Sequence, residues 1–106
     1  MKLSITCRAF HPLHRNTLRG FCEIRIEELR LVIRDIAVHA KGSARWVQLP
    51  AKPQMRDGEL VRDADGKLQY FHLMSFETRA VSDAFSAAVI RALLEFAPSA
   101  FEKEEV

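Results

Sequence analysis

The chain has 106 residues, a one-domain length, and 48% of them are hydrophobic, so it can bury a core and is not expected to be disordered. Its longest stretch without a charged residue is only nine residues, Leu68 to Phe76, whereas a membrane helix needs about 20 apolar residues. The first ten residues interrupt their apolar run with Arg8 and do not resemble a secretion signal. We therefore expect a cytoplasmic protein that does not enter a membrane.

The net charge of +2 hides an uneven distribution along the chain. Residues 1–56 carry eleven Lys and Arg against four Asp and Glu, whereas residues 57–106 carry five against ten. Such a division can arise by chance in a chain with many surface charges, or it can mark a basic face that binds nucleic acid.

Alternating apolar and polar residues predict the first two strands, from Leu3 to Phe10 and from Thr17 to Glu27. Turn residues fill the segment between them, which we expect to be a loop. Symmetric pairing about this loop brings three apolar pairs into register, namely Leu3 with Ile26, Ile5 with Ile24 and Cys7 with Cys22. These pairs support an antiparallel hairpin with one buried face.

A second hairpin is predicted by the strand-like runs Leu31 to Val38 and Arg45 to Leu49, with Gly42 in the turn between them. Leu29, Leu31 and Ile33 lie at odd positions, whereas Ile36 and Val38 lie at even ones, so the apolar face changes at Arg34-Asp35. A β-bulge there would return all five residues to one buried face. In the second run, Trp46 points away from the predicted core.

The rest of the chain predicts one tight turn, a fifth strand and a helix. Asp57-Gly58 favours a tight reversal, because Gly tolerates the positive φ that such a turn needs. The segment Leu68 to Phe76 has apolar residues on both faces, as expected of a strand covered on both sides. Apolar residues that recur every three or four positions form one stripe and predict a helix from Thr78 to Phe96, which Pro98 ends. The stripe consists of Val81, Phe85, Ala88, Val89, Ala92, Leu93 and Phe96.

These elements predict an α+β fold, an antiparallel sheet of about five strands with one C-terminal helix. The single domain would span residues 1–100, followed by a charged, frayed tail over residues 101–106. One helix can cover only one face of such a sheet. The apolar residues left uncovered predict a homodimer, and they include Trp46, Phe71, Ile90 and Leu94.

The residues that could carry chemistry match no familiar metal or catalytic pattern. Ligand types that zinc prefers occur in one string, which consists of Cys7, His11, His14 and Cys22. Its spacing fits no common zinc module, small buried thiols explain the cysteines as well, and a reducing cytoplasm disfavours a disulfide between them. His72 could pair with Asp63 or Asp65 as acid and base, yet a lone His on a strand is more often structural. We expect no metal, no cofactor, no small-molecule substrate and no enzymatic activity.

Several short motifs follow one another in the middle and later thirds of the chain. In order, they are Arg34-Asp35-Ile36-Ala37-Val38, Gly42, Trp46-Val47, Leu49-Pro50-Ala51-Lys52, Asp57-Gly58-Glu59, Arg62-Asp63 and the segment from His72 to Arg79. As a set they resemble the stage V sporulation protein G family of small bacterial septation and sporulation regulators. The resemblance implies a regulator that binds DNA, or in some members RNA. The cations that match the family pattern are Arg34, Lys52, Arg62 and Arg79.

Phosphates bind where Lys and Arg gather on one side of a fold, and unpaired bases stack on aromatic side chains. Two predicted surfaces meet these needs. The first is the second hairpin with its loop, where five cations are expected to surround Trp46: Arg34, Lys41, Arg45, Lys52 and Arg56. The second is the solvent face of the first two strands, with Arg8, Arg19, Phe21 and Arg25. Trp46 itself suits base stacking and a dimer contact equally well.

From these surfaces we expect a small bacterial regulator that binds the backbone phosphates of DNA or RNA through the basic hairpin and loop. The predicted helix is too apolar to leave the core and read a major groove. The alternative function is a dimeric, non-catalytic scaffold that recruits a protein partner.

Overall fold

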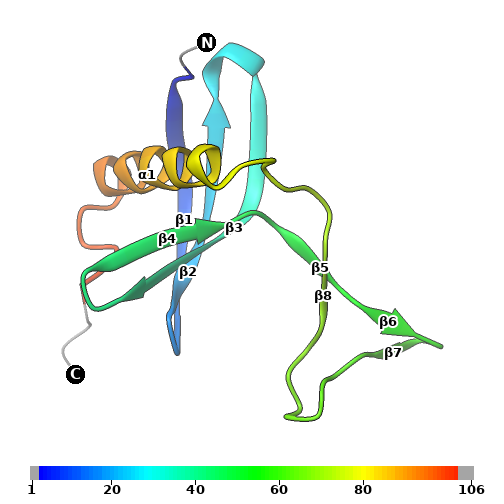
Figure 1. Cartoon of the computed structure of the whole chain (residues 1–106). Helices are drawn as coiled ribbons and strands as arrows, with labels where there is room; N and C mark the ends of the chain where they lie inside the picture. Colours follow the sequence, from blue (N-terminus) through cyan, green and yellow to red (C-terminus); the bar gives the residue numbers. More distant parts are fainter. Residues whose placement is uncertain (1–2, 103–106) are drawn as a thin grey trace.

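The chain folds into a four-stranded antiparallel sheet packed on one helix, with an arm that projects from the sheet (Figure 1). This computed structural model describes residues 3–102. The sheet has the strand order β1-β2-β3-β4, with β1 (Ile5–Arg15), β2 (Leu18–Ile26), β3 (Leu31–Lys41) and β4 (Ala44–Gln48), and the helix is α1 (Arg79–Phe96). The predicted α+β class, an antiparallel sheet with a C-terminal helix, is confirmed. Across residues 3–102, no helix is long and apolar enough to span a membrane.

The first hairpin forms, but its predicted register is wrong. β1 continues through the expected loop to Arg15, and the chain reverses at Asn16-Thr17, where Asn16 has a φ of 55°. Asn tolerates this left-handed conformation better than most residues. The later turn and a bulge between Cys7 and Ala9 move the pairing, which becomes Ile5 with Ile26, Cys7 with Ile24 and Phe10 with Cys22. Near Ile5 the observed register differs from the predicted one by two residues. A shift of two residues preserves the alternation of side chains, so the same side chains of β2 still face inward.

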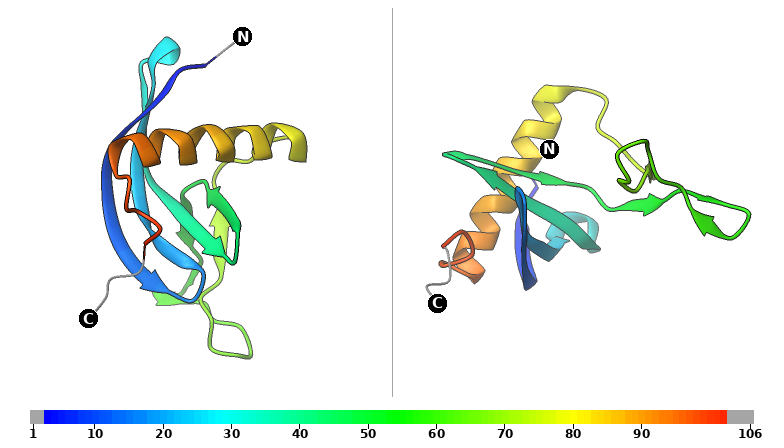
Figure 2. Two further views of the ribbon diagram at one scale, coloured as in Figure 1. Left: turned by 90° about the vertical axis from the view of Figure 1, so that its left-hand side faces the viewer. Right: turned by 90° about the horizontal axis from the view of Figure 1, so that it is seen from below.

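The core lies between α1 and one face of the sheet (Figure 2). The predicted bulge at Arg34-Asp35 is confirmed, because Ile33 lies opposite Ile24 whereas Ile36 lies opposite Cys22. The buried side chains of this core are Cys22, Ile24, Ile26, Ile36, Val38, Val47, Val89, Leu93 and Ala100. Leu29 and Leu31, expected on the same face, are exposed, and Leu29 belongs to a short 3-10 turn, Glu27–Leu29, rather than to β3.

The helix has the predicted extent. Thr78 is its N-cap, and the Thr78 hydroxyl accepts a hydrogen bond from the backbone N–H of Val81. The middle of the predicted stripe is buried, but Val81 is 53% exposed, because it lies in the first turn of α1, beyond the edge of the core. Ile90, expected off the stripe, instead packs against the core.

Residues 51–76 form the arm, which extends away from the sheet (Figures 1 and 2). Its strands are β5 (Ala51–Pro53), β6 (Met55–Arg56), β7 (Glu59–Leu60) and β8 (Tyr70–His72). β6 and β7 flank Asp57-Gly58, and both turn residues have positive φ, so the predicted tight turn is confirmed.

The predicted fifth strand of the sheet is wrong. Only Tyr70–His72 of the expected segment is a strand, and it pairs with β5 in the arm rather than with the main sheet. Pro50 lies between β4 and β5, and because it has no N–H it cannot extend the β4 ladder. The Cα radius of gyration is 15.0 Å, above the roughly 13 Å of a compact 100-residue domain, which reflects the projecting arm.

Candidate nucleic-acid interface

In the part of the chain that the structure describes, α1 packs on one face of the sheet (Figure 2), and we call the opposite face the open face. Residues there alternate with the buried core positions of β2, β3 and β4. Its aromatic and charged side chains are His11, Arg19, Phe21, Glu23, Arg25, Arg34, His39, Lys41 and Trp46, together with Arg8, which contacts Glu23, Glu27, which contacts Arg25, and Asp35, which lies beside Arg34. The open face therefore combines aromatic rings with an excess of positive charge.

A stacked pair of rings lies on the open face. His39 and Trp46 are directly paired residues of β3 and β4, and their rings lie parallel, 5° apart, with centroids separated by 5.4 Å. The Gln48 Oε1 atom lies 3.1 Å from His39 Nε2 and accepts its hydrogen. This leaves His39 Nδ1 to accept from the Thr17 hydroxyl at 2.9 Å. Both ring nitrogens are thus engaged, and the pair is held rigidly.

Further aromatic side chains continue from this pair across the sheet. Phe21 lies opposite Ala37, two residues before His39 on β3, and His11 of β1 lies opposite Phe21. Diagonal neighbours of this kind have Cα atoms roughly 7–8 Å apart. His11, Phe21, His39 and Trp46 therefore form an aromatic row that crosses all four strands.

Cations flank the aromatic row. The Glu23 carboxylate lies 3.1 Å from Arg34 Nε and 3.9 Å from Arg8 Nε, so one negative charge is shared by two guanidinium groups. Lys41 lies at the other end of β3, beside the turn to β4. Because the row crosses β3 between Arg34 and Lys41, a phosphate chain that followed it would have positive charge on either side.

The structure separates the six residues predicted to bind nucleic acid. Arg34, Lys41 and Trp46 lie on the open face. Arg45 lies on the helix side, with its guanidinium carbon 4.2 Å from the centre of the Phe101 ring, which packs against the core. Lys52 and Arg56 lie on the arm.

The five cations therefore do not surround Trp46 as the sequence suggested. Phe101 was also expected to lie in the frayed tail, but it is partly buried. Residues 103–106 of that predicted tail lie outside the described part of the chain.

His11 and His39 are members of the aromatic row that sequence reasoning missed, and His39 is the one that contacts Trp46. The signal was available in the hairpin itself, because a two-residue turn at Gly42-Ser43 places His39 directly opposite Trp46. A His opposite an exposed Trp in a predicted sheet is a cross-strand aromatic pair.

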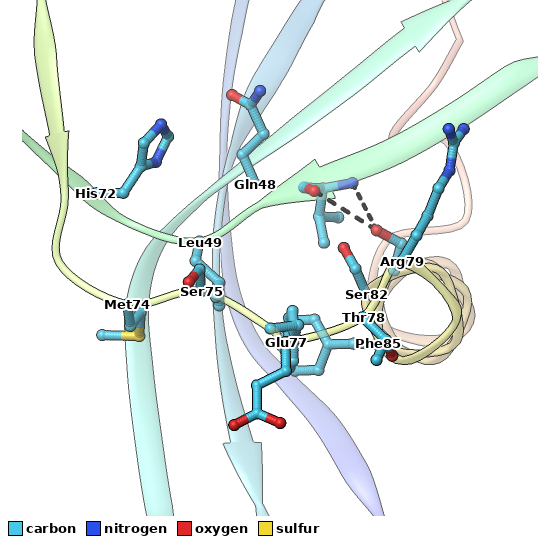
Figure 3. Close-up of a pocket in the computed structure, with 13 residues that line it drawn as sticks. Gln48, Leu49, His72, Met74, Ser75, Glu77, Thr78, Arg79, Ser82 and Phe85 are labelled. Carbon is cyan, nitrogen blue, oxygen red and sulfur yellow. Dashed lines mark hydrogen bonds between the residues drawn. The ribbon is translucent and has the colours of Figure 1, made fainter.

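A pocket lies between β4, the start of α1 and the end of the arm, and Figure 3 shows its lining. The Ser86 hydroxyl lies 3.2 Å from the backbone N and 3.5 Å from the backbone O of Val47, which fixes α1 to β4. The side chains of Gln48, His72, Glu77 and Arg79 stand around the rim and do not converge (Figure 3). The pocket thus does not bring an acid and a base onto one reacting atom.

The two cysteines behave as core residues. Burial raises the pKa of the Cys22 thiol to about 12, so this thiol is neutral at physiological pH. Cys7 lies opposite Ile24 rather than opposite Cys22, and both cysteines are free. In the part of the chain that the structure describes, no three His, Cys, Asp or Glu side chains are grouped to hold a metal ion.

The half-buried position of His39 predicts a pH-dependent stability. Burial, and to a smaller extent nearby Arg19, lowers the pKa of His39 below its ordinary value of 6.5, although the bond to Gln48 acts the other way. Between the lowered pKa of the folded state and 6.5, the unfolded chain takes up a proton that the folded chain does not. The neutral His39 therefore makes its whole contribution to stability above pH 6.5, and this contribution is lost as the pH falls. We expect the free energy of unfolding, measured in urea, to fall from pH 7.5 to pH 6. The His39→Gln variant should show a smaller fall, and an identical fall in both proteins would contradict this assignment.

Comparison of the chain with family models, with curated proteins and with solved structures finds no match. The functional assignment therefore rests on the residues of the chain and their geometry.

Proposed function

We propose that this protein is a small nucleic-acid-binding protein whose working surface is the open face of the sheet. The observation that carries the proposal is the His39–Trp46 stack, a rigid aromatic pair on an uncovered sheet between Arg34 and Lys41. Aromatic faces and flanking cations are what sequence-tolerant binding of a phosphate chain requires. A regulatory role is what the resemblance to the sporulation and septation regulators implies.

The proposal can be tested by removing cations from the open face and measuring how binding depends on salt. Binding of labelled DNA and RNA is measured by fluorescence anisotropy at low and near-physiological salt. Each phosphate contact contributes about 0.7 to 0.9 to the slope of log affinity against log salt. We expect the double variant Arg34→Gln, Lys41→Gln to bind at least about tenfold more weakly at low salt and to reduce the slope by about 1.5.

The arm supplies a matched control for this experiment. The double variant Lys52→Gln, Arg56→Gln removes the same net charge from the same half of the sequence, but from a different surface. Equal losses in both double variants would mean that only net charge matters, and a larger loss in the arm variant would place the phosphate contacts on the loop. No binding to any nucleic acid at low salt would overturn the proposal.

The arm favours a second role, as a subunit contact. Its exposed apolar residues are Met55, Leu60, Tyr70, Phe71, Leu73 and Met74. A two-stranded ladder with so much exposed apolar surface is not stable alone, and a second copy of the chain would cover it. We propose a homodimer formed through the arm, which light scattering would test. Recruitment of another protein by the same residues is the alternative if the chain is monomeric.

A further inference from the structure

We infer that the open face selects single-stranded nucleic acid over duplex, with bases stacked along the aromatic row. This inference rests on the proposed function and specifies its ligand. The base faces of a duplex are covered by neighbouring base pairs, whereas those of a single strand are free to stack on a side chain. Rings that stand on a sheet surface therefore offer most to unpaired bases.

The dimensions of the open face agree with this choice. Three strand spacings of about 4.8 Å make the row roughly 14 Å wide between β1 and β4. The major groove of B-DNA is about 12 Å wide and admits a helix or a two-stranded ribbon. A four-stranded sheet is too broad to enter it, and α1 is fixed to the core through Val89 and Leu93.

The row is also organised before any ligand binds. Among the residues that the structure describes, β4 is an edge strand of the four-stranded sheet, so no strand pairs with it on the side of Trp46 away from β3 and His39. Thr17 and Gln48 fix the His39 ring through both nitrogens, and so little side-chain freedom is lost when a base stacks. Since these nitrogens are occupied, His39 offers a ring face rather than hydrogen bonds, which predicts weak sequence preference.

Trp46 gives a direct readout, because it is the only tryptophan of the chain. The full-length protein is titrated at low salt with an unlabelled mixed-sequence oligonucleotide, with its RNA equivalent and with the corresponding DNA duplex. We expect saturable quenching of Trp46 fluorescence by the single strands, at concentrations at least about tenfold below those needed with the duplex.

A matched pair of variants separates the aromatic row from the other exposed aromatic residues. Phe21→Leu removes a ring from the row, and Phe96→Leu makes the same change at the C-terminal end of α1, where Phe96 is 51% exposed. Phe21→Leu should weaken single-strand binding by about fivefold to tenfold, while Phe96→Leu leaves it unchanged. Thermal melts show whether each variant is folded. If a variant does not fold, the quenching of Trp46 in the unmodified protein still compares single strands with duplex.

The outcomes distinguish this inference from the proposed function. Salt-dependent binding in which duplex matches single strand, or in which Phe21→Leu binds as tightly as the unmodified protein, would overturn the inference and leave the proposed function standing. Binding of duplex alone, weakened by Lys52→Gln, Arg56→Gln, would instead assign recognition to the β6–β7 hairpin as a groove-binding ribbon. Absence of binding to all three nucleic acids would overturn both proposals.

Discussion

Replacing Gly20 with Ala is expected to destabilise the protein by about 3 kcal/mol, a large fraction of the total stability of a small domain. Gly20 is buried in β2, between Pro12 of β1 and Val38 of β3. A Cβ atom there would lie 2.5 Å from the backbone oxygen of His11 and 2.7 Å from the Phe10 ring. The first of these atoms belongs to the β1 backbone, so the hairpin itself would have to move. Its φ of 157° adds strain for any residue with a side chain.

Gly42 provides the control for this prediction. It has a φ of 60° in the β3–β4 turn, but a Cβ atom there would have no neighbour within 4 Å. Gly42→Ala should therefore cost only the backbone strain, about 1 kcal/mol. Urea unfolding of both variants at one protein concentration measures the difference. Equal stabilities would show that β1 does not approach β2 as closely as the structure indicates.

Patterns that depend on neighbouring residues could be predicted from the sequence. The parity change at Arg34-Asp35 predicted the bulge, because one extra residue is the local way to return a strand to its buried face. Asp57-Gly58 predicted its tight turn for a similarly local reason. The ends of the helix were predictable because Thr78 caps its start and Pro98 follows its end, and both signals are local in the sequence.

Features set by distant parts of the chain were missed. The first hairpin has shifts near Arg8 and before Arg15 that no alternation pattern reveals, so its register could not be read from symmetry. Arg45 turns toward α1 and Phe101, a contact that depends on where the C-terminal segment returns. The predicted binding site was only partly right for the same reason. Lys52 and Arg56 follow the β3–β4 hairpin closely in sequence, but they lie on the arm, which projects away from the sheet.

The second large effect is expected for Leu93, which the sequence places on the same apolar stripe of the helix as Val81. Leu93 is fully buried between α1 and the sheet, whereas Val81 is 53% exposed. Leu93→Ala removes buried methyl groups and leaves a cavity, so we expect a loss of about 3 kcal/mol in the free energy of unfolding. Val81→Ala, with little burial to lose, should change it by less than about 0.5 kcal/mol.

The same two variants also distinguish the monomer core from a subunit contact. Core packing acts at every protein concentration, so the loss in Leu93→Ala should be the same in dilute and concentrated samples. If Val81→Ala proves costly, and its cost grows with protein concentration, Val81 is buried by a second copy and the subunit contact reaches from the arm to the start of α1. A Leu93→Ala variant as stable as the unmodified protein would mean that α1 does not pack on the sheet through this face. In that case the face we call open would lose the feature that defines it, because it is identified as the side of the sheet that α1 leaves uncovered.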